Sequence, residues 1–202
     1  MKEAAAYKCA MRILTLLFII ILAGCSAKHE STATNSDESV GAQLSPEMFR
    51  KIASAPGDDT PLVPKLAAIG NLWTNADVSI AITYQDGRVI KEAAHRTAKT
   101  VGGKYLVFTI QSQSSKQPVD SIETYDNEAS AFKVLGINGD TVTGATIVYD
   151  FEKKSYTMNS SYGDGLTEVC VGSFSNSMDT NRTQLYKKGV LIATRDTKTI
   201  PK

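Results

Sequence analysis

The sequence predicts an all-β protein, in which an antiparallel up-and-down meander of eight to ten strands closes into a barrel. From about Gly70 onward, short runs alternate apolar and polar residues, which is typical of strands with one face on a core. Turn signals such as Asp86-Gly87 and Gly102-Gly103 separate these runs every ten to sixteen residues. No convincing long amphipathic helix interrupts them. A meander of this size usually closes, because closure removes its exposed edges.

The first 24 residues have the pattern of a secretory signal peptide. The apolar run Ile13 to Leu22 has only ten residues, whereas a membrane-spanning helix needs about 20, and basic residues precede it. The run ends at Leu22-Ala23-Gly24-Cys25, which resembles the lipobox of bacterial lipoproteins. That resemblance implies that signal peptidase recognises Leu22, Ala23 and Gly24 and cuts before Cys25. The alternative is a cysteine that merely lies near a conventional cleavage site.

In lipoproteins the cysteine receives a diacylglyceryl group and its new amine is acylated by a fatty acid such as palmitate. Two or more acyl chains hold a protein firmly on a bilayer, so Cys25 predicts a membrane anchor. Ser26 follows the cysteine. Many Gram-negative inner-membrane lipoproteins carry Asp at that position, so Ser26 favours the outer membrane, with the domain facing the periplasm.

Charge and cysteine content restrict the possible partners. Without residues 1–24 the chain keeps 19 basic and 20 acidic residues, a formal charge of −1, so it has no basic surplus for nucleic acid. Cys9 leaves with the signal peptide and Cys25 is lipidated, so Cys170 has no disulfide partner. Cys170 lies in an apolar strand-like run, which predicts a buried, inert thiol.

Residues 25–61 are expected to form the lipidated cysteine and a flexible tether, and residues 62–202 one domain. Within the tether, Ser45 is a candidate N-cap and Pro46 a candidate first helical residue, which predicts a short helix over 46–54. Its apolar residues, including Phe49, are suited to dock on the domain.

The domain's turn residues delimit nine strand-like runs in order. These are 77–85, 88–100, 104–113, 119–126, 131–137, 141–152, 155–162, 166–174 and 190–199. In the first run Val78, Ile80 and Ile82 share a face with Tyr84. The third run is apolar on both faces, which predicts that the helix carrying Phe49 covers it from outside.

The entrance to this region, Leu66 to Ile80, and the meander that follows resemble the lipocalin-like or calycin barrels. Lipocalins begin with Gly-x-Trp, where the tryptophan closes one end of the barrel; here Gly70 and Trp73 are separated by two residues. An arginine of the last lipocalin strand packs over that tryptophan. The resemblance implies that Trp73 is a structural plug and that Arg195 packs on it by a cation–π contact, with Arg182 as an alternative.

A lipocalin-like barrel also implies an interior that either is filled by side chains or holds one small ligand. Aromatic residues are the candidates for the wall of such a cavity. They are Tyr84, Phe108, Tyr149, Phe151 and Tyr156.

The chain contains no recognisable catalytic, nucleotide-binding or metal-binding motif, and no cofactor is expected. His29 lies in the tether, and a lone His95 is more often a surface residue than a general base. Several acidic residues are candidates for the mouth of the barrel or for solvated loop ends. They are Asp120, Glu123, Asp126 and Asp150.

Three functions remain open on these observations. The first is a lipid-anchored envelope protein that binds a small apolar or amphipathic ligand in the barrel. The second is a structural lipoprotein whose outer face contacts an envelope protein, which an exposed apolar patch would favour. The third is a small barrel enzyme, which requires His95 to point into a pocket beside an acid. The fold alone does not decide among them.

Overall fold

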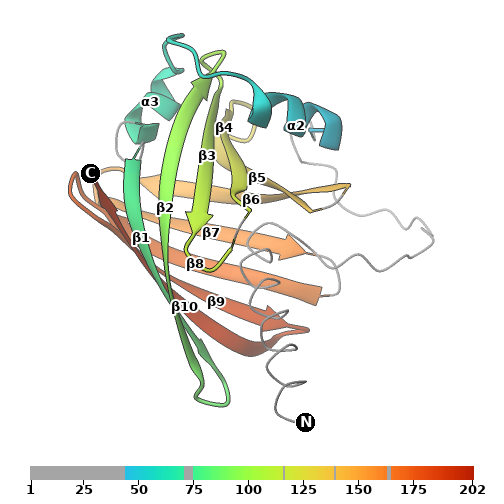
Figure 1. Cartoon of the computed structure of the whole chain (residues 1–202), viewed down its shortest axis with the longest axis vertical. Coiled ribbons are helices and arrows are strands. Elements are labelled where there is room, and N and C mark those ends of the chain that lie inside the picture. The colour runs from blue at the N-terminus through green and yellow to red at the C-terminus, as the bar shows by residue number, and fades with distance from the viewer. Residues whose placement is uncertain (1–43, 71–74, 116, 139, 163–164) are drawn as a thin grey trace.

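Ten antiparallel strands form a closed barrel in the computed structural model, which describes residues 44–202 apart from 71–74, 116, 139 and 163–164 (Figure 1). The lipobox and Trp73 lie outside the described residues. The strands are β1 (Asn75–Tyr84), β2 (Val89–Val101), β3 (Tyr105–Ser112), β4 (Val119–Asp126), β5 (Ala131–Asn138), β6 (Thr141–Asp150), β7 (Ser155–Tyr162), β8 (Leu166–Phe174), β9 (Asp179–Lys187) and β10 (Val190–Pro201). The predicted fold class is therefore confirmed.

Each strand pairs with its neighbours in the sequence, and β1 pairs with β10 to close the sheet. In that closing pair Ala76 lies opposite Pro201 and Tyr84 opposite Ala193. Several of the connections are tight turns that contain residues with positive φ, such as Lys188 (50°) and Gly189 (79°) between β9 and β10. Two successive residues with positive φ give the primed turn whose twist matches that of the strands it joins.

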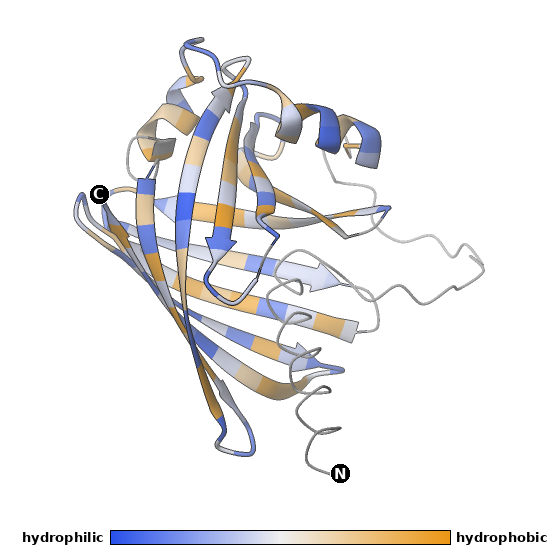
Figure 2. Ribbon diagram, viewed as in Figure 1, coloured by the Kyte–Doolittle hydropathy of each residue, from blue (hydrophilic) through white to orange (hydrophobic). Residues whose placement is uncertain are grey.

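The strand pattern separates an inner from an outer face, and hydrophobic and hydrophilic residues alternate along much of each strand (Figure 2). On β1 the buried Val78, Ile80 and Ile82 face inward, where they pack with Leu185 of β9 and Ala193 of β10. Strand β9 has no counterpart among the runs delimited from the sequence.

Helix α2 (Pro46–Ser54) has the bounds expected for the short helix and lies against the outside of the barrel. The Ser45 side chain accepts a hydrogen bond from the Met48 backbone N–H at 3.1 Å, which caps the first turn. Phe49 and Ile52 are buried against Val107 of β3 and Ile122 of β4. The strand that is apolar on both faces is thus covered from outside by this helix, as expected.

The C-terminal end of α2 is held by a side chain of the barrel. The Lys99 ammonium group on β2 donates hydrogen bonds of 2.7 Å to the carbonyl oxygens of Ala53 and Ala55. A cation at the negative end of the helix dipole stabilises both the helix and its docking.

Helix α3 (Pro64–Gly70), which the sequence pattern does not mark, closes one end of the barrel. Its Leu66 and Ile69 are almost fully buried against the inward-facing Phe132 of β5 and Ile147 of β6. No helix among the residues described is long and apolar enough to cross a bilayer.

Candidate functional site

The candidate site is a cavity of about 220 Å³ inside the barrel. Every strand contributes to its wall, so the site depends on closure of the whole sheet. Its aliphatic and sulfur-containing wall residues are Val78, Ile80, Ile110, Val119, Val134, Ile147, Met158 and Cys170. Its aromatic and polar wall residues are Phe108, Tyr149, Tyr156, Arg96, Glu123, Asp179, Asn181, Arg195, Ser121, Thr183, Thr197 and Thr199. A water molecule occupies about 30 Å³ in the liquid, so a cavity of this volume could hold roughly seven waters.

Three of the five aromatic residues predicted to line a cavity do so: Phe108, Tyr149 and Tyr156. Tyr84, at the end of β1, packs at the edge of the β1–β10 core and lies outside the cavity wall. Phe151, also outside that wall, follows the last residue of β6, is 39% exposed and stacks on Tyr149 with ring centroids 5.7 Å apart.

Two buried carboxylates face the cavity, each bonded to a tyrosine. The Tyr149 hydroxyl donates to Glu123 Oε1 at 3.2 Å, and the Tyr156 hydroxyl donates to Asp179 Oδ1 at 2.9 Å. The Asn181 amide donates in turn to the Tyr156 hydroxyl at 3.1 Å. The two tyrosine rings are 5.4 Å apart, so the carboxylates of β4 and β9 belong to one connected cluster.

Arg96 of β2 is the cation of this cluster. Its guanidinium lies over the ring of Phe108, 5.1 Å from the ring centroid, and it interacts electrostatically with both Glu123 and Asp179. Burial lowers the pKa of Arg96, and the two carboxylates partly offset that effect. Arginine keeps its charge in proteins, so Arg96 is a permanent positive charge on the cavity wall.

The carboxylates have strongly perturbed acidity. Burial raises the pKa of Glu123 to about 7, and the Tyr149 hydrogen bond and the Arg96 charge offset only part of this rise. Burial likewise raises the pKa of Asp179 to about 6, against the opposing effects of Tyr156, Arg96 and Asn181. Near neutral pH, Glu123 therefore exchanges between its neutral and its charged form.

A second buried pair crosses the barrel from β10 to β8. Arg195 Nη1 lies 3.4 Å from Glu168 Oε1, and Arg195 Nη2 donates to the Thr183 hydroxyl at 3.2 Å. Tyr162 donates to the other Glu168 oxygen at 3.2 Å. Of the two arginines considered for the barrel plug, Arg195 is the one that points inward, because Arg182 lies outside in a two-bond ion pair with Asp196.

The other candidate residues for chemistry lie outside the cavity. His95 is on the outer face of β2, where its Nδ1 is 3.2 Å from Asp77 Oδ1. Asp120 accepts a hydrogen bond from Thr109, and Asp150 pairs with Lys153 in the β6–β7 turn. Within the described part of the chain, no group of three or more His, Cys, Asp or Glu residues is arranged to hold a metal ion.

Sequence reasoning named Glu123 only as one of several mouth or loop acids, and it missed Arg96, Asp179 and Glu168. The signal that could have found Glu123 was the alternation of inward and outward side chains along β4. On β4, Ser121 and Glu123 face inward because the intervening Ile122 is buried outward under α2. The most hydrophobic residue of this strand therefore points away from the cavity.

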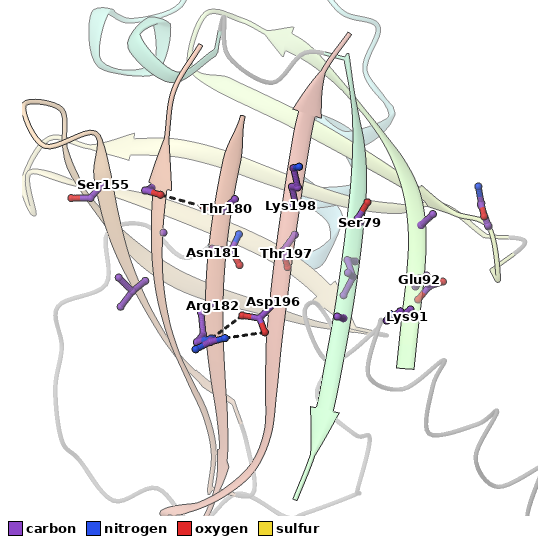
Figure 3. A pocket seen from close by; sticks show the side chains of 17 residues that line it. Ser79, Lys91, Glu92, Ser155, Thr180, Asn181, Arg182, Asp196, Thr197 and Lys198 are labelled. Atoms are coloured by element: carbon purple, nitrogen blue, oxygen red, sulfur yellow. Dashed lines mark hydrogen bonds and ion pairs between the residues drawn. The ribbon is translucent and has the colours of Figure 1, made fainter. Parts of the chain in front are cut away.

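A larger depression of about 1120 Å³ lies on the outer wall, across β1, β2 and β7 to β10 (Figure 3). It is wide open to solvent, and outward side chains such as Ser79, Thr180 and Lys198 surround it. Its most prominent charges, Arg182 and Asp196, already neutralise each other. The interior cavity is the better candidate site, because its charged groups are buried and face a space inside the barrel that is less open than this depression.

No family model matches this chain, and no curated protein matches it. Among solved structures, the chain is similar to a protein of unknown function from the DUF3598 family of Nostoc punctiforme, with a TM-score of 0.51 and 11% sequence identity. The match covers 71% of this chain and 51% of that protein, so this chain spans about half the length of its structural relative. At this identity the likeness supports the fold alone.

Gly172 is expected to be intolerant of substitution, because the Tyr156 ring lies over its Cα and an added Cβ would overlap that ring. We expect Gly172→Ala to lower the free energy of unfolding by about 1–3 kcal/mol, as overpacking does, in urea titrations. Gly144→Ala is the matched control in a strand, since its Cβ would meet the flexible end of Leu135 at 3.1 Å and the Val134 carbonyl oxygen at an ordinary contact distance of 3.8 Å. Equal stability of the two variants would contradict the expected packing.

Glu123 is expected to make the protein less stable as the pH rises. Its pKa is about 7 in the folded state and 4.5 as the unperturbed value, so the folded state binds the proton more tightly between these values. The stability that Glu123 contributes is fully present below pH 4.5 and is lost as the pH rises through about 7. In Glu123→Gln this loss is absent, so the variant should gain up to about 3 kcal/mol on the parent between pH 5 and pH 8.

The measurement is urea unfolding of parent and variant across that pH range. Glu128→Gln, which removes an exposed carboxylate in the β4–β5 turn, is the control and should follow the parent. Parallel pH profiles for the parent and Glu123→Gln would show that Glu123 does not titrate as described.

Proposed function

We propose that this protein is a lipid-anchored lipoprotein of the bacterial cell envelope whose barrel binds a small amphipathic molecule in its interior. The observation that carries the proposal is the cavity, which combines an aliphatic and aromatic wall with buried charged side chains. Cys25 supplies the anchor, and the outer membrane facing the periplasm is the proposed location.

The energetics of the cavity support binding over a purely structural interior. A barrel of this size is stable when apolar side chains fill it. Buried ions cost several kcal/mol each in lost hydration, and apolar replacements are often neutral or stabilising. Glu123 and Asp179 are both about 5% exposed, yet they border a space that no side chain of the described residues fills. A ligand that is polar at one end and apolar at the other matches both parts of this wall.

A second candidate function, contact with an envelope protein, is favoured by valines on the outer wall. Val148 of β6 and Val171 of β8 are 59% and 57% exposed, and Val169 of β8 is 40% exposed. Thr157 of β7 pairs with both Val148 and Val171, so these two valines lie in one row across three strands. This row is a site where a protein partner gains apolar contact.

The lipid anchor predicts that Cys25 carries fatty acyl chains. In bacteria grown with radioactive palmitate, we expect the full-length chain to be labelled and Cys25→Ala to be unlabelled. Cys170→Ala removes the buried thiol of β8 and should keep the label. Label that survives Cys25→Ala would contradict the anchor and leave the barrel proposal untouched.

The ligand is tested by native mass spectrometry of the full-length chain, extracted gently from bacterial membranes. We expect an extra mass that is released on denaturation. Met158→Trp, which places a larger ring in the cavity, should abolish that mass, whereas Thr157→Trp on the outer face of the same strand should keep it. Both variants are first checked for a folded barrel by circular dichroism.

A reproducible ligand-free mass in the parent chain would argue against cavity binding and favour the contact function. An extra mass that survives Met158→Trp would place the bound molecule elsewhere on the protein.

A further inference from the structure

The charges of the cavity do not balance, and this imbalance bears on the kind of ligand. Arg195 and Glu168 form a pair that is closed by Thr183 and Tyr162. Among the residues that the structure describes, the remaining charged groups on the cavity wall are Arg96 from β2, Glu123 from β4 and Asp179 from β9. One cation therefore faces two acids, and full ionisation leaves one excess negative charge in a buried space.

An excess buried charge is unfavourable unless a counter-charge or a proton neutralises it. Without a ligand, the neutralising species below about pH 7 is a proton, because the pKa of Glu123 is about 7 and that of Asp179 about 6. A cationic group of a ligand takes over the role of this proton. An anionic group would instead raise the excess to two negative charges, which disfavours carboxylate or phosphate ligands.

The hydrogen-bonding capacity of the two acids also favours a cationic group that donates hydrogen bonds. An ionised carboxylate has about four acceptor positions, and the tyrosine uses one on each of Glu123 and Asp179. An ammonium group has three N–H donors and no acceptor, so it is complementary to these two acids. The rings of Tyr149 and Tyr156 pack against each other, and each tyrosine is bonded to one of the two acids. The faces of aromatic rings also attract an ammonium group.

The rest of the wall fits an apolar body. Ile80, Ile147 and Met158 border the same cavity. The volume of about 220 Å³ restricts that body to a small aliphatic chain or a single ring.

We propose that the barrel binds a small organic amine, with its ammonium group held between Glu123 and Asp179 and its apolar body on the aliphatic wall. This proposal rests on the proposed function, the binding of an amphipathic molecule in the cavity, and names its chemical class. Binding is an exchange of cations: the ammonium ion enters with its charge, and the carboxyl group of Glu123 releases its proton to solvent.

This exchange has a measurable consequence for pH. The groups that face the two acids are Arg96 of β2, Tyr149 of β6, Tyr156 of β7, Cys170 of β8 and Asn181 of β9, with the Arg195–Glu168 pair beyond them. Burial raises the pKa values of both tyrosines and of Cys170, so these three groups stay neutral between pH 5.5 and 7.5 while the two acids titrate. Amine affinity should therefore fall about tenfold from pH 7.5 to 6.0 as these acids take up protons.

The experiment is isothermal titration calorimetry of the full-length chain with three probes that share a phenyl body. They are 2-phenylethylamine, 2-phenylethanol and 3-phenylpropionate. We expect the amine to bind at least tenfold more tightly than the other two at pH 7.5, with about 0.3 proton released per amine bound at that pH and about one or more at pH 6.0. Titrations in two buffers with different ionisation enthalpies measure that proton release.

Two variants test the named acids. Glu123→Gln should weaken amine binding at least tenfold and flatten its pH dependence, while the weaker binding of the alcohol changes little. Asp179→Asn is the second variant, in case Glu123→Gln does not fold, and Glu128→Gln on the surface should bind as the parent does. Met158→Trp should prevent binding of every probe.

Preference for the alcohol or the carboxylate, with binding abolished by Met158→Trp, would overturn the amine proposal and leave the proposed function standing. Amine binding without proton release, or unchanged in both acid variants, would also overturn it. No binding of any probe would overturn it too, and the proposed function then depends on the mass found by native mass spectrometry.

Discussion

The pairing of β1 with β10 is the constraint on which the rest of the structure depends. It joins Ala76–Tyr84 to Ala193–Pro201, and without it two strands of ten and twelve residues would have open edges. Closure also divides the side chains into an inner and an outer set. Since side chains alternate along a strand, a slip of one residue in this pairing would turn Arg195 outward and bring Arg182's partner Asp196 inside.

Once the sheet is closed, every polar group that the register places inside needs a hydrogen-bond partner there. Arg195 is bonded to Glu168 and Thr183, in a network whose members all have partners. Such a network fixes β8, β9 and β10 relative to one another. The cluster around Arg96 is different, because two acids share one guanidinium and border a space. The first network is complete in itself, whereas the second borders the cavity for which ligand binding is proposed.

The fold followed from local signals because turns and strand alternation are encoded by adjacent residues. Helix α2 was predictable for the same reason, through Ser45 and Pro46. Helix α3 lacked such signals, since it has seven residues and gains its stability from burial of Leu66 and Ile69. Strand β9 escaped notice because its sequence, DTNRTQLYK, places Asp179, Asn181 and Thr183 on the inner face, where an apolar pattern is expected.

The site was less predictable, because it depends on which face of each strand is inside. The alternation of side chains along β6 correctly places Tyr149 inside the barrel. It does not apply to Phe151, because β6 ends at Asp150 and the alternation does not continue beyond the strand. Charged residues such as Arg96 and Glu123 are assigned to solvent by default, and only tertiary structure reverses that assignment. Three of the five predicted aromatic residues line the cavity, whereas Tyr84, the last residue of β1, and Phe151, just beyond the end of β6, do not.

Helix α2 explains how β4 tolerates a carboxylate inside the barrel. A strand in a small barrel normally gains its stability from apolar side chains that face the core. On β4 part of that contribution comes from the outside, where Ile122 is fully buried beneath Phe49 and Ile52. The inner positions Ser121 and Glu123 are thereby released from the requirement to be apolar. The short helix within the expected tether therefore supports the candidate site, because it stabilises the strand that presents Glu123 to the cavity.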